Sequence, residues 1–89
     1  MKVIFDPGKD RRNISKHGVS LALAEKLEWN LMTCWEDDRE DYFELRLKCL
    51  APFGPVIYCV ALTEDDDHYR IFSLRKATPK EVRDYVRRR

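Results

Sequence analysis

The segment RIFSLRKA at residues 70–77, followed directly by TPKE at residues 78–81, defines the fold of this chain better than any other stretch. The first part has the composition of an apolar β-strand, with three cations in it and just beyond it. The second part begins a helix, because Thr78 is suited to the N-cap, Pro79 to the first helical position and Glu81 to a capping box. Since a cation is costly to bury unpaired, we expect these basic side chains to face solvent, an acidic partner or a phosphate.

The composition is that of one folded domain. The 89 residues are 44% hydrophobic and 11% aromatic, enough for a single modest core. No apolar run approaches the roughly 20 residues that span a bilayer, and the N-terminus lacks the pattern of a secretory signal. We therefore expect a single domain over residues 1–89, located in the cytoplasm and without a membrane partner.

The charge is unevenly distributed along the chain. The total is +1, but residues 1–33 carry a net +2, residues 34–67 a net −7 and residues 68–89 a net +6. A solvated charged surface is the simplest explanation. The basic end also suits an anionic ligand such as nucleic acid, and the acidic middle suits a basic partner protein.

The three cysteines, Cys34, Cys49 and Cys59, are odd in number and have no C-x-x-C spacing. They are therefore expected to be small buried hydrophobic side chains with free thiols in a reducing compartment. The ligand spacing that a zinc site would need with His17 or His68 is absent, so no metal or other cofactor is expected.

Periodicity and turn residues predict the other elements. Helices are expected over residues 9–17, ended by Gly18, and after Ser20, where one face is apolar: Leu23, Ala24, Leu27 and Leu31. The predicted strands cover residues 3–5, 31–35, 42–50, 56–62 and 68–74, with the fourth central because it is apolar on both faces. Residues 36–41 form a polar loop, and residues 52–55 and 64–67 form turns. In the last helix, Val82, Tyr85 and Val86 are expected to form the apolar face.

These elements predict an α+β fold class. Two N-terminal helices precede an antiparallel β-sheet, a meander, and a C-terminal helix follows it. The short connections place consecutive strands side by side, with the helices expected on one face of the sheet.

Three groups of residues, in this order, resemble the BrnT toxins of the RelE-like microbial ribonuclease fold. The opening group is Phe5-Asp6-Pro7, Lys9, Asn13 and Lys16-His17-Gly18-Val19; the middle group is Asp38-Arg39, Tyr42, Glu44 and Arg46; the closing group is residues 70–77, Glu81 and Tyr85. The similarity covers nearly the whole chain. The sequence differs from the pattern of these toxins at three positions. It has Phe5 where the family often has Trp, Phe43 where the family often has Gly, and Leu74 where the family usually has Ala.

The resemblance implies a ribonuclease toxin of a type II toxin–antitoxin system that cleaves RNA without a metal and inhibits translation. The implied partner is a BrnA-like antitoxin with a ribbon-helix-helix DNA-binding domain. The two proteins would form a heterotetramer that contacts operator DNA only through the antitoxin.

Metal-free RNA cleavage needs a base for the ribose 2′-hydroxyl, cations for the charged phosphorane and an acid for the leaving 5′-oxygen. The candidates for the cations are Arg46, Arg70 and Arg75; those for proton transfer are Lys16, His17, Glu64 and Tyr85. The nuclease interpretation requires the arginines to gather on one exposed surface. Replacing Arg75 with alanine is then expected to abolish activity with little change in melting temperature.

Each candidate also has a structural interpretation. His17 suits the C-terminal end of a helix, Glu64 a solvated turn and Tyr85 the packed face of the last helix, while Arg46 suits a surface ion pair. Arg70 and Arg75 are five residues apart, so a regular strand sends them to opposite faces unless it ends or bulges between them. A non-catalytic nucleic-acid-binding module and a degenerate toxin retained for protein interaction remain alternatives.

Overall fold

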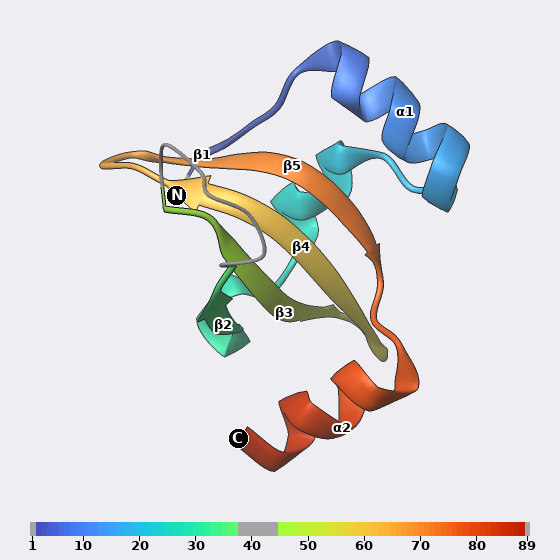
Figure 1. The fold of residues 1–89 in the computed structure, drawn as a ribbon, viewed down its shortest axis with the longest axis vertical. Coiled ribbons are helices and arrows are strands. Elements are labelled where there is room, and N and C mark those ends of the chain that lie inside the picture. Colours follow the sequence, from blue (N-terminus) through green and yellow to red (C-terminus); the bar gives the residue numbers. More distant parts are fainter. Residues whose placement is uncertain (1, 38–44, 89) are drawn as a thin grey trace.

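The computed structural model describes residues 2–37 and 45–88, and within them one five-stranded sheet forms the centre of the molecule (Figure 1). The strands are β1 (Lys2–Ile4), β2 (Thr33–Glu36), β3 (Leu47–Phe53), β4 (Val56–Glu64) and β5 (His68–Lys76). The helices are α1 (Pro7–His17), α2 (Pro79–Arg88) and two 3₁₀ helices, η1 (Leu21–Lys26) and η2 (Trp29–Leu31). None of the helices described has the length and apolar character of a membrane span.

The predicted α+β class is confirmed, but the sheet is mixed. Its order is β1-β5-β4-β3-β2, so β2 to β5 form the predicted antiparallel meander with β4 in the middle. β1 pairs with β5 in parallel, which the prediction of a purely antiparallel sheet missed. Three residues at a sheet edge carry no pattern that distinguishes a parallel from an antiparallel neighbour.

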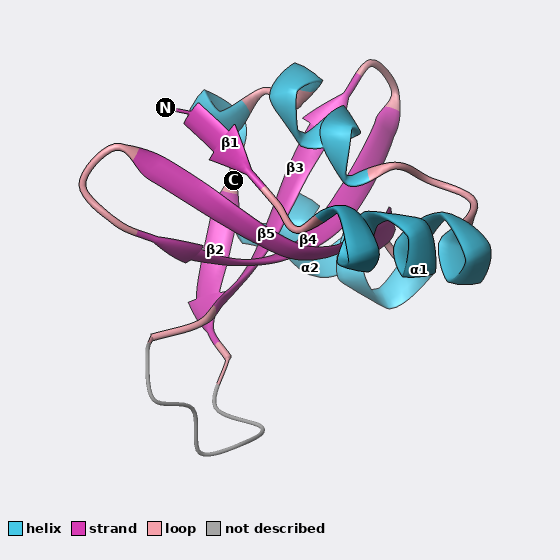
Figure 2. Ribbon diagram, turned by 90° about the horizontal axis from the view of Figure 1, so that it is seen from above, coloured by secondary structure: helices cyan, strands magenta, loops and turns pink. Residues whose placement is uncertain are grey.

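The helices cover both faces of the sheet, so the prediction that they share one face is wrong (Figure 2). On the first face, residues of η1 join those of the strands in the main core: Leu21, Ala24, Leu27, Cys49, Ala51, Val60, Leu62, Tyr69, Ile71 and Leu74. On the second face, Tyr85 of α2 packs against Leu50 and Cys59 in a smaller cluster. Because β3 and β4 carry apolar side chains on both faces, each face needs a cover.

The segment after Ser20 forms 3₁₀ helices where a continuous α-helix was predicted. Ser20 is the expected N-cap, since its Oγ accepts a hydrogen bond of 3.1 Å from the Ala22 amide. The buried residues of the segment, Leu21, Ala24 and Leu27, recur every third position, which matches the three residues per turn of a 3₁₀ helix.

Several predicted boundaries shift. The third strand begins at Leu47 and continues to Phe53, so the turn before β4 is confined to Gly54 and Pro55. Gly54 has a φ of 60°, a left-handed conformation that favours glycine. Residues 42–44 of the predicted strand, and residues 38–41 of the predicted loop, lie outside the described residues.

The prediction of three free thiols is wrong for two of them. Cys34 and Cys49 form a disulfide, whereas Cys59 is free and buried. The two paired cysteines stand directly opposite each other in the antiparallel register of β2 and β3, with 4.1 Å between their Cα atoms. The register that places them opposite each other could not be predicted from two cysteines 15 residues apart in the sequence.

The buried face of α2 also differs from the prediction. Glu81 and Tyr85 are 7% and 4% exposed, while Val86 is 65% exposed. The Arg88 guanidinium lies over the Trp35 ring, so the face turned to the sheet follows positions 81, 85 and 88. The Glu81 carboxylate is buried because it pairs with Lys48 and Arg75 of the sheet beneath the helix. These ion pairs explain why α2 turns this face, and not the apolar face predicted, toward the sheet.

Asn13 of α1 completes the outer edge of β5. β1 pairs with β5 only as far as Arg70, so among the described residues no strand pairs with the later part of β5 on that side. The Asn13 amide nitrogen donates to the Leu74 carbonyl at 2.7 Å and to the Val19 carbonyl at 2.8 Å, and its oxygen accepts from the Leu74 amide at 3.1 Å. One side chain thus replaces a missing strand partner and fixes α1 against the sheet.

Replacing Asn13 with alanine should lower the free energy of unfolding by about 2–4 kcal/mol, because it leaves the buried polar groups of Leu74 unsatisfied. Urea denaturation measures this change. Ser15→Ala, at an exposed position of the same helix, is the matched control and should change stability by less than about 0.5 kcal/mol. Equal stability of the two variants would contradict the assigned role.

Candidate functional site

A bulge in β5 brings Arg70 and Arg75 to the same face of the sheet. The register between β4 and β5 shifts by one residue at Phe72, which is the extra residue of the bulge. Ile71 and Leu74, on either side of the bulge, both point into the main core. Alternation on each side of the bulge therefore directs both arginines to the second face, the face that α2 partly covers. The bulge is the condition under which Arg70 and Arg75, five residues apart, were expected to share a face.

Small side chains form the floor of the second face between these cations. Cross-strand pairing places Ala61 between Lys48 and Ser73, and Cys59 beside Arg75. Lys48 belongs to the row of Ala61, and Arg75 belongs to the next row on the same face, the row of Cys59. Successive rows on one face of a sheet lie about 7 Å apart.

A hollow of about 310 Å³ opens above this floor. Its lining comes from β2 to β5 and from the residue after β2: Trp35, Glu36, Asp37, Lys48, Cys59, Ala61, Ser73 and Arg75. Asp37 is only 9% exposed, and its amide donates a hydrogen bond of 2.7 Å to the Arg46 carbonyl. The hollow therefore combines two cations with two carboxylates, of which Asp37 is largely buried and Glu36 is exposed.

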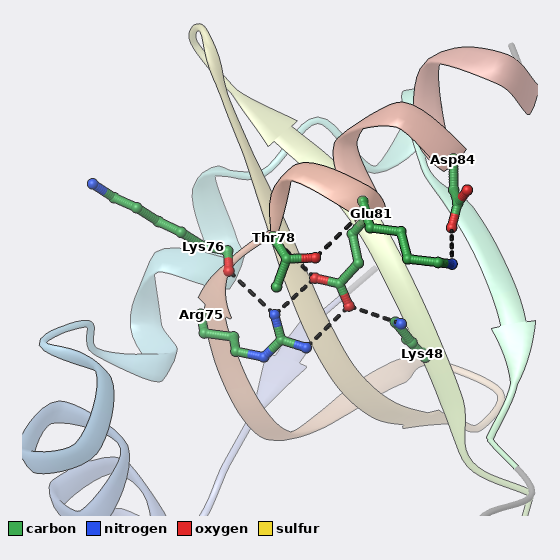
Figure 3. A network of polar contacts seen from close by, with 7 residues as sticks. Lys48, Arg75, Lys76, Thr78, Glu81 and Asp84 are labelled. Atoms are coloured by element: carbon green, nitrogen blue, oxygen red, sulfur yellow. Dashed lines mark hydrogen bonds and ion pairs between the residues drawn. The ribbon is translucent and has the colours of Figure 1, made fainter.

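Glu81 of α2 holds the two cations in place (Figure 3). Its carboxylate accepts from Arg75 Nη1 at 2.8 Å and from Arg75 Nη2 at 3.0 Å, a bidentate pair. Lys48 Nζ lies 2.8 Å from Oε2, and the Thr78 amide donates to Oε1 at 2.8 Å. The Glu81 amide in turn donates to Thr78 Oγ1 at 3.2 Å, which confirms the predicted capping box.

Hydrogen bonds from Arg75, followed by those from Lys48 and the Thr78 amide, hold the pKa of the Glu81 carboxyl far below its ordinary value against the opposing effect of burial. The carboxylate is therefore ionised at neutral pH. One negative charge faces two positive charges, so the group formed by Lys48, Arg75 and Glu81 keeps a net charge of +1.

Burial raises the pKa of the Cys59 thiol, and the nearby Glu81 carboxylate adds to this effect although Arg75 opposes it. Cys59 is therefore a neutral thiol at physiological pH. A thiol held in this form is a poor nucleophile, so Cys59 serves as part of the floor.

Arg70 lies further along the same face, and Arg46 contacts Phe72, the extra residue of the bulge. The Arg46 guanidinium carbon is 4.0 Å from the centre of the Phe72 ring, a close cation–π contact, and Lys9 Nζ is 5.7 Å from it. Arg70 is exposed and stands opposite Thr63. The expected open cluster of three arginines is therefore not observed: Arg75 is bound to Glu81, Arg46 lies against Phe72, and Arg70 stands opposite Thr63.

The proton-transfer candidates do not gather in the hollow. Lys16 and His17 end α1 and are absent from its lining. Glu64 ends β4 on the first face. There, burial raises the pKa of Tyr69, and the negative charge of the Glu64 carboxylate raises it further. The Tyr85 hydroxyl donates a hydrogen bond of 2.7 Å to the Leu31 carbonyl within the smaller cluster, as the packing interpretation predicted.

Sequence reasoning did not name Asp37 and Lys48 as candidates, and it assigned Glu81 to the helix cap and to the closing family motif but not to the site. Lys48 was detectable, because it lies two residues after Arg46 and therefore on the same polar face of a predicted strand. Asp37 belongs to an acidic run in which nothing distinguishes one carboxylate from its neighbours.

The fold and the hollow define a small α+β protein whose open sheet face carries fixed cations suited to a phosphate-bearing ligand. The family described as "Ribonuclease toxin, BrnT, of type II toxin-antitoxin system" matches residues 5–81. The chain therefore belongs to the BrnT family of ribonuclease toxins, as the ordered motifs indicated. A search of the curated proteins found no similar sequence.

Proposed function

We propose that this protein is a metal-independent endoribonuclease with a RelE-like fold, and that it inhibits translation by cleaving RNA. The observation that carries this proposal is the fixed position of Lys48 and Arg75 above a floor of small side chains. A phosphodiester in the hollow meets preorganised positive charge, which is the usual source of transition-state stabilisation in such reactions.

In the proposed reaction, Lys48 and Arg75 bind the scissile phosphate, and Asp37 accepts the proton of the 2′-hydroxyl. The 2′-oxygen attacks phosphorus, and the bond from phosphorus to the 5′-oxygen breaks. The products are a 2′,3′-cyclic phosphate and a 5′-hydroxyl, whose proton comes from the Lys48 ammonium group. Arg46 and Arg70 bind phosphates of the RNA strand outside the hollow. Lys16, His17, Glu64 and Tyr85 have no part in this scheme, because they do not line the hollow.

A type II system implies an antitoxin partner. In our proposal this partner is a BrnA-like protein with a ribbon-helix-helix domain, which neutralises the toxin in the cytoplasm. The complex is a heterotetramer that reaches operator DNA through the antitoxin alone.

The direct test is cleavage of a single-stranded RNA by the purified protein in the presence of EDTA. We expect cleavage to persist in EDTA and the upstream product to end in a cyclic phosphate. Loss of cleavage in EDTA, with recovery on adding Mg²⁺, would contradict the metal-independent mechanism. Salt-sensitive binding that leaves the RNA intact would identify a nucleic-acid-binding module instead.

A further inference from the structure

A groove beside the hollow continues the basic surface toward the end of α2. It has a volume of about 460 Å³, within the range of ligand pockets. Trp35 and Lys48 line both the hollow and the groove, so the two depressions share one wall. Arg87 and Arg88, in the last turn of α2, form the other side of the groove.

Trp35 and Arg88 form a stacked pair within this groove. The Arg88 guanidinium carbon lies 4.9 Å from the centre of the Trp35 ring. Trp35 also packs against the smaller core cluster, which holds the indole in a fixed position. The guanidinium lies over the indole ring, and a guanidinium held over an aromatic ring offers its own plane for a nucleic-acid base to stack on.

The charge at this end of the helix suits a phosphate. Arg87 is 75% exposed in its side chain, and its Nη1 lies 3.7 Å from Asp84 Oδ1, a long ion pair at the surface. Such a pair is weak and is screened by salt, so a phosphate can replace the carboxylate at little cost. Asp84 also pairs with Lys80 at 3.2 Å, so it keeps a partner when Arg87 turns away.

We propose that this groove binds a nucleotide next to the scissile phosphate of single-stranded RNA. The base stacks on the guanidinium of the Trp35–Arg88 pair, and Arg87 binds the phosphate of this nucleotide, while Lys48 stays with the scissile phosphate. The inference rests on the proposed function, since it extends the path of the same substrate from the hollow into the groove. Stacking accepts any base, so the groove adds affinity more than sequence preference.

The test measures binding of a 2′-O-methyl oligoribonucleotide, which cannot be cleaved because its 2′-oxygen is blocked. Arg88→Gln should weaken binding roughly 10-fold and reduce the slope of log affinity against log salt by about 1. Arg83→Gln removes the same charge from an exposed position of α2 outside the groove and should have a much smaller effect. Trp35→Phe should retain most of the affinity and Trp35→Leu should lose it, with melting temperatures recorded for both.

The outcomes separate this inference from the proposed function. Wild-type protein that cleaves RNA, with Arg88→Gln and Arg83→Gln variants equal in affinity, would overturn the groove alone. Wild-type protein that neither binds nor cleaves would overturn the proposed function as well. If Arg88→Gln weakened binding of the antitoxin but not of the oligonucleotide, the groove would be a protein contact and the inference would be wrong.

Discussion

The double variant Arg75→Ala/Glu81→Gln is expected to cleave RNA about 10²–10³-fold more slowly than the wild-type protein while unfolding at nearly the same urea concentration as the single variant Glu81→Gln. The loss of rate follows from removing a guanidinium that binds the transition-state phosphate. The stability should match that of Glu81→Gln because a neutral glutamine at position 81 no longer requires a cationic partner, so the removal of Arg75 costs little more.

Arg75→Ala alone does not separate these effects. The single variant leaves the Glu81 carboxylate, 9% exposed in its side chain, with Lys48 as its remaining ion-pair partner. We expect it to lose about 2–3 kcal/mol of stability in addition to its activity. The expectation from sequence, an unchanged melting temperature, is therefore replaced by a lower one.

Lys76→Ala is the matched control, because it removes one positive charge from the exposed neighbouring position of β5. Its cleavage rate should stay within a few-fold of the wild-type rate. A double variant that still cleaves RNA at the rate of Lys76→Ala would show that Arg75 does not bind the reacting phosphate.

The sequence predicted the meander, the end of α1 at Gly18 and the N-caps Ser20 and Thr78, because these depend on local signals. A run that is apolar on both faces defines β4, and the Thr78 cap defines the start of α2. The direction of β1 and the pairing of Cys34 with Cys49 depend on register between distant segments. Local propensity carries no information about such register.

The site was predicted in part, for a related reason. Residue type made Arg75 a candidate phosphate ligand, which stays a prediction, and the bulge required for its convergence with Arg70 was foreseen as a condition. The capping pattern identified Glu81, but a cap residue is ordinarily exposed. Only the packing of α2 across the sheet gives this carboxylate its second role as the partner of Lys48 and Arg75. A residue's role at such a site depends on elements that meet in the folded protein.

Glu81→Gln should lower the free energy of unfolding by about 2–3 kcal/mol at pH 7, and the difference from wild type should shrink as the solution is acidified. Hydrogen bonds from Arg75, then Lys48, depress the pKa of Glu81 in the folded protein below its ordinary value of 4.5. A carboxyl with a depressed pKa stabilises the fold at pH values above its unfolded pKa, and this contribution is lost as the pH falls through the range below it. The wild-type and Glu81→Gln stabilities should therefore converge below about pH 4.5.

Urea denaturation between pH 7 and pH 3 measures this convergence. Asp84→Asn is the matched control, because Asp84 is also a carboxylate on α2 with two cationic partners, Lys80 and Arg87. Its partners are 79% and 75% exposed, so the pairs should contribute less than about 1 kcal/mol, and the control curve should stay close to the wild-type curve throughout. If the Glu81→Gln curve ran parallel to the wild-type curve down to pH 3, Glu81 would not be the ionised partner of Lys48 and Arg75, and the positioning of the cations would need another cause.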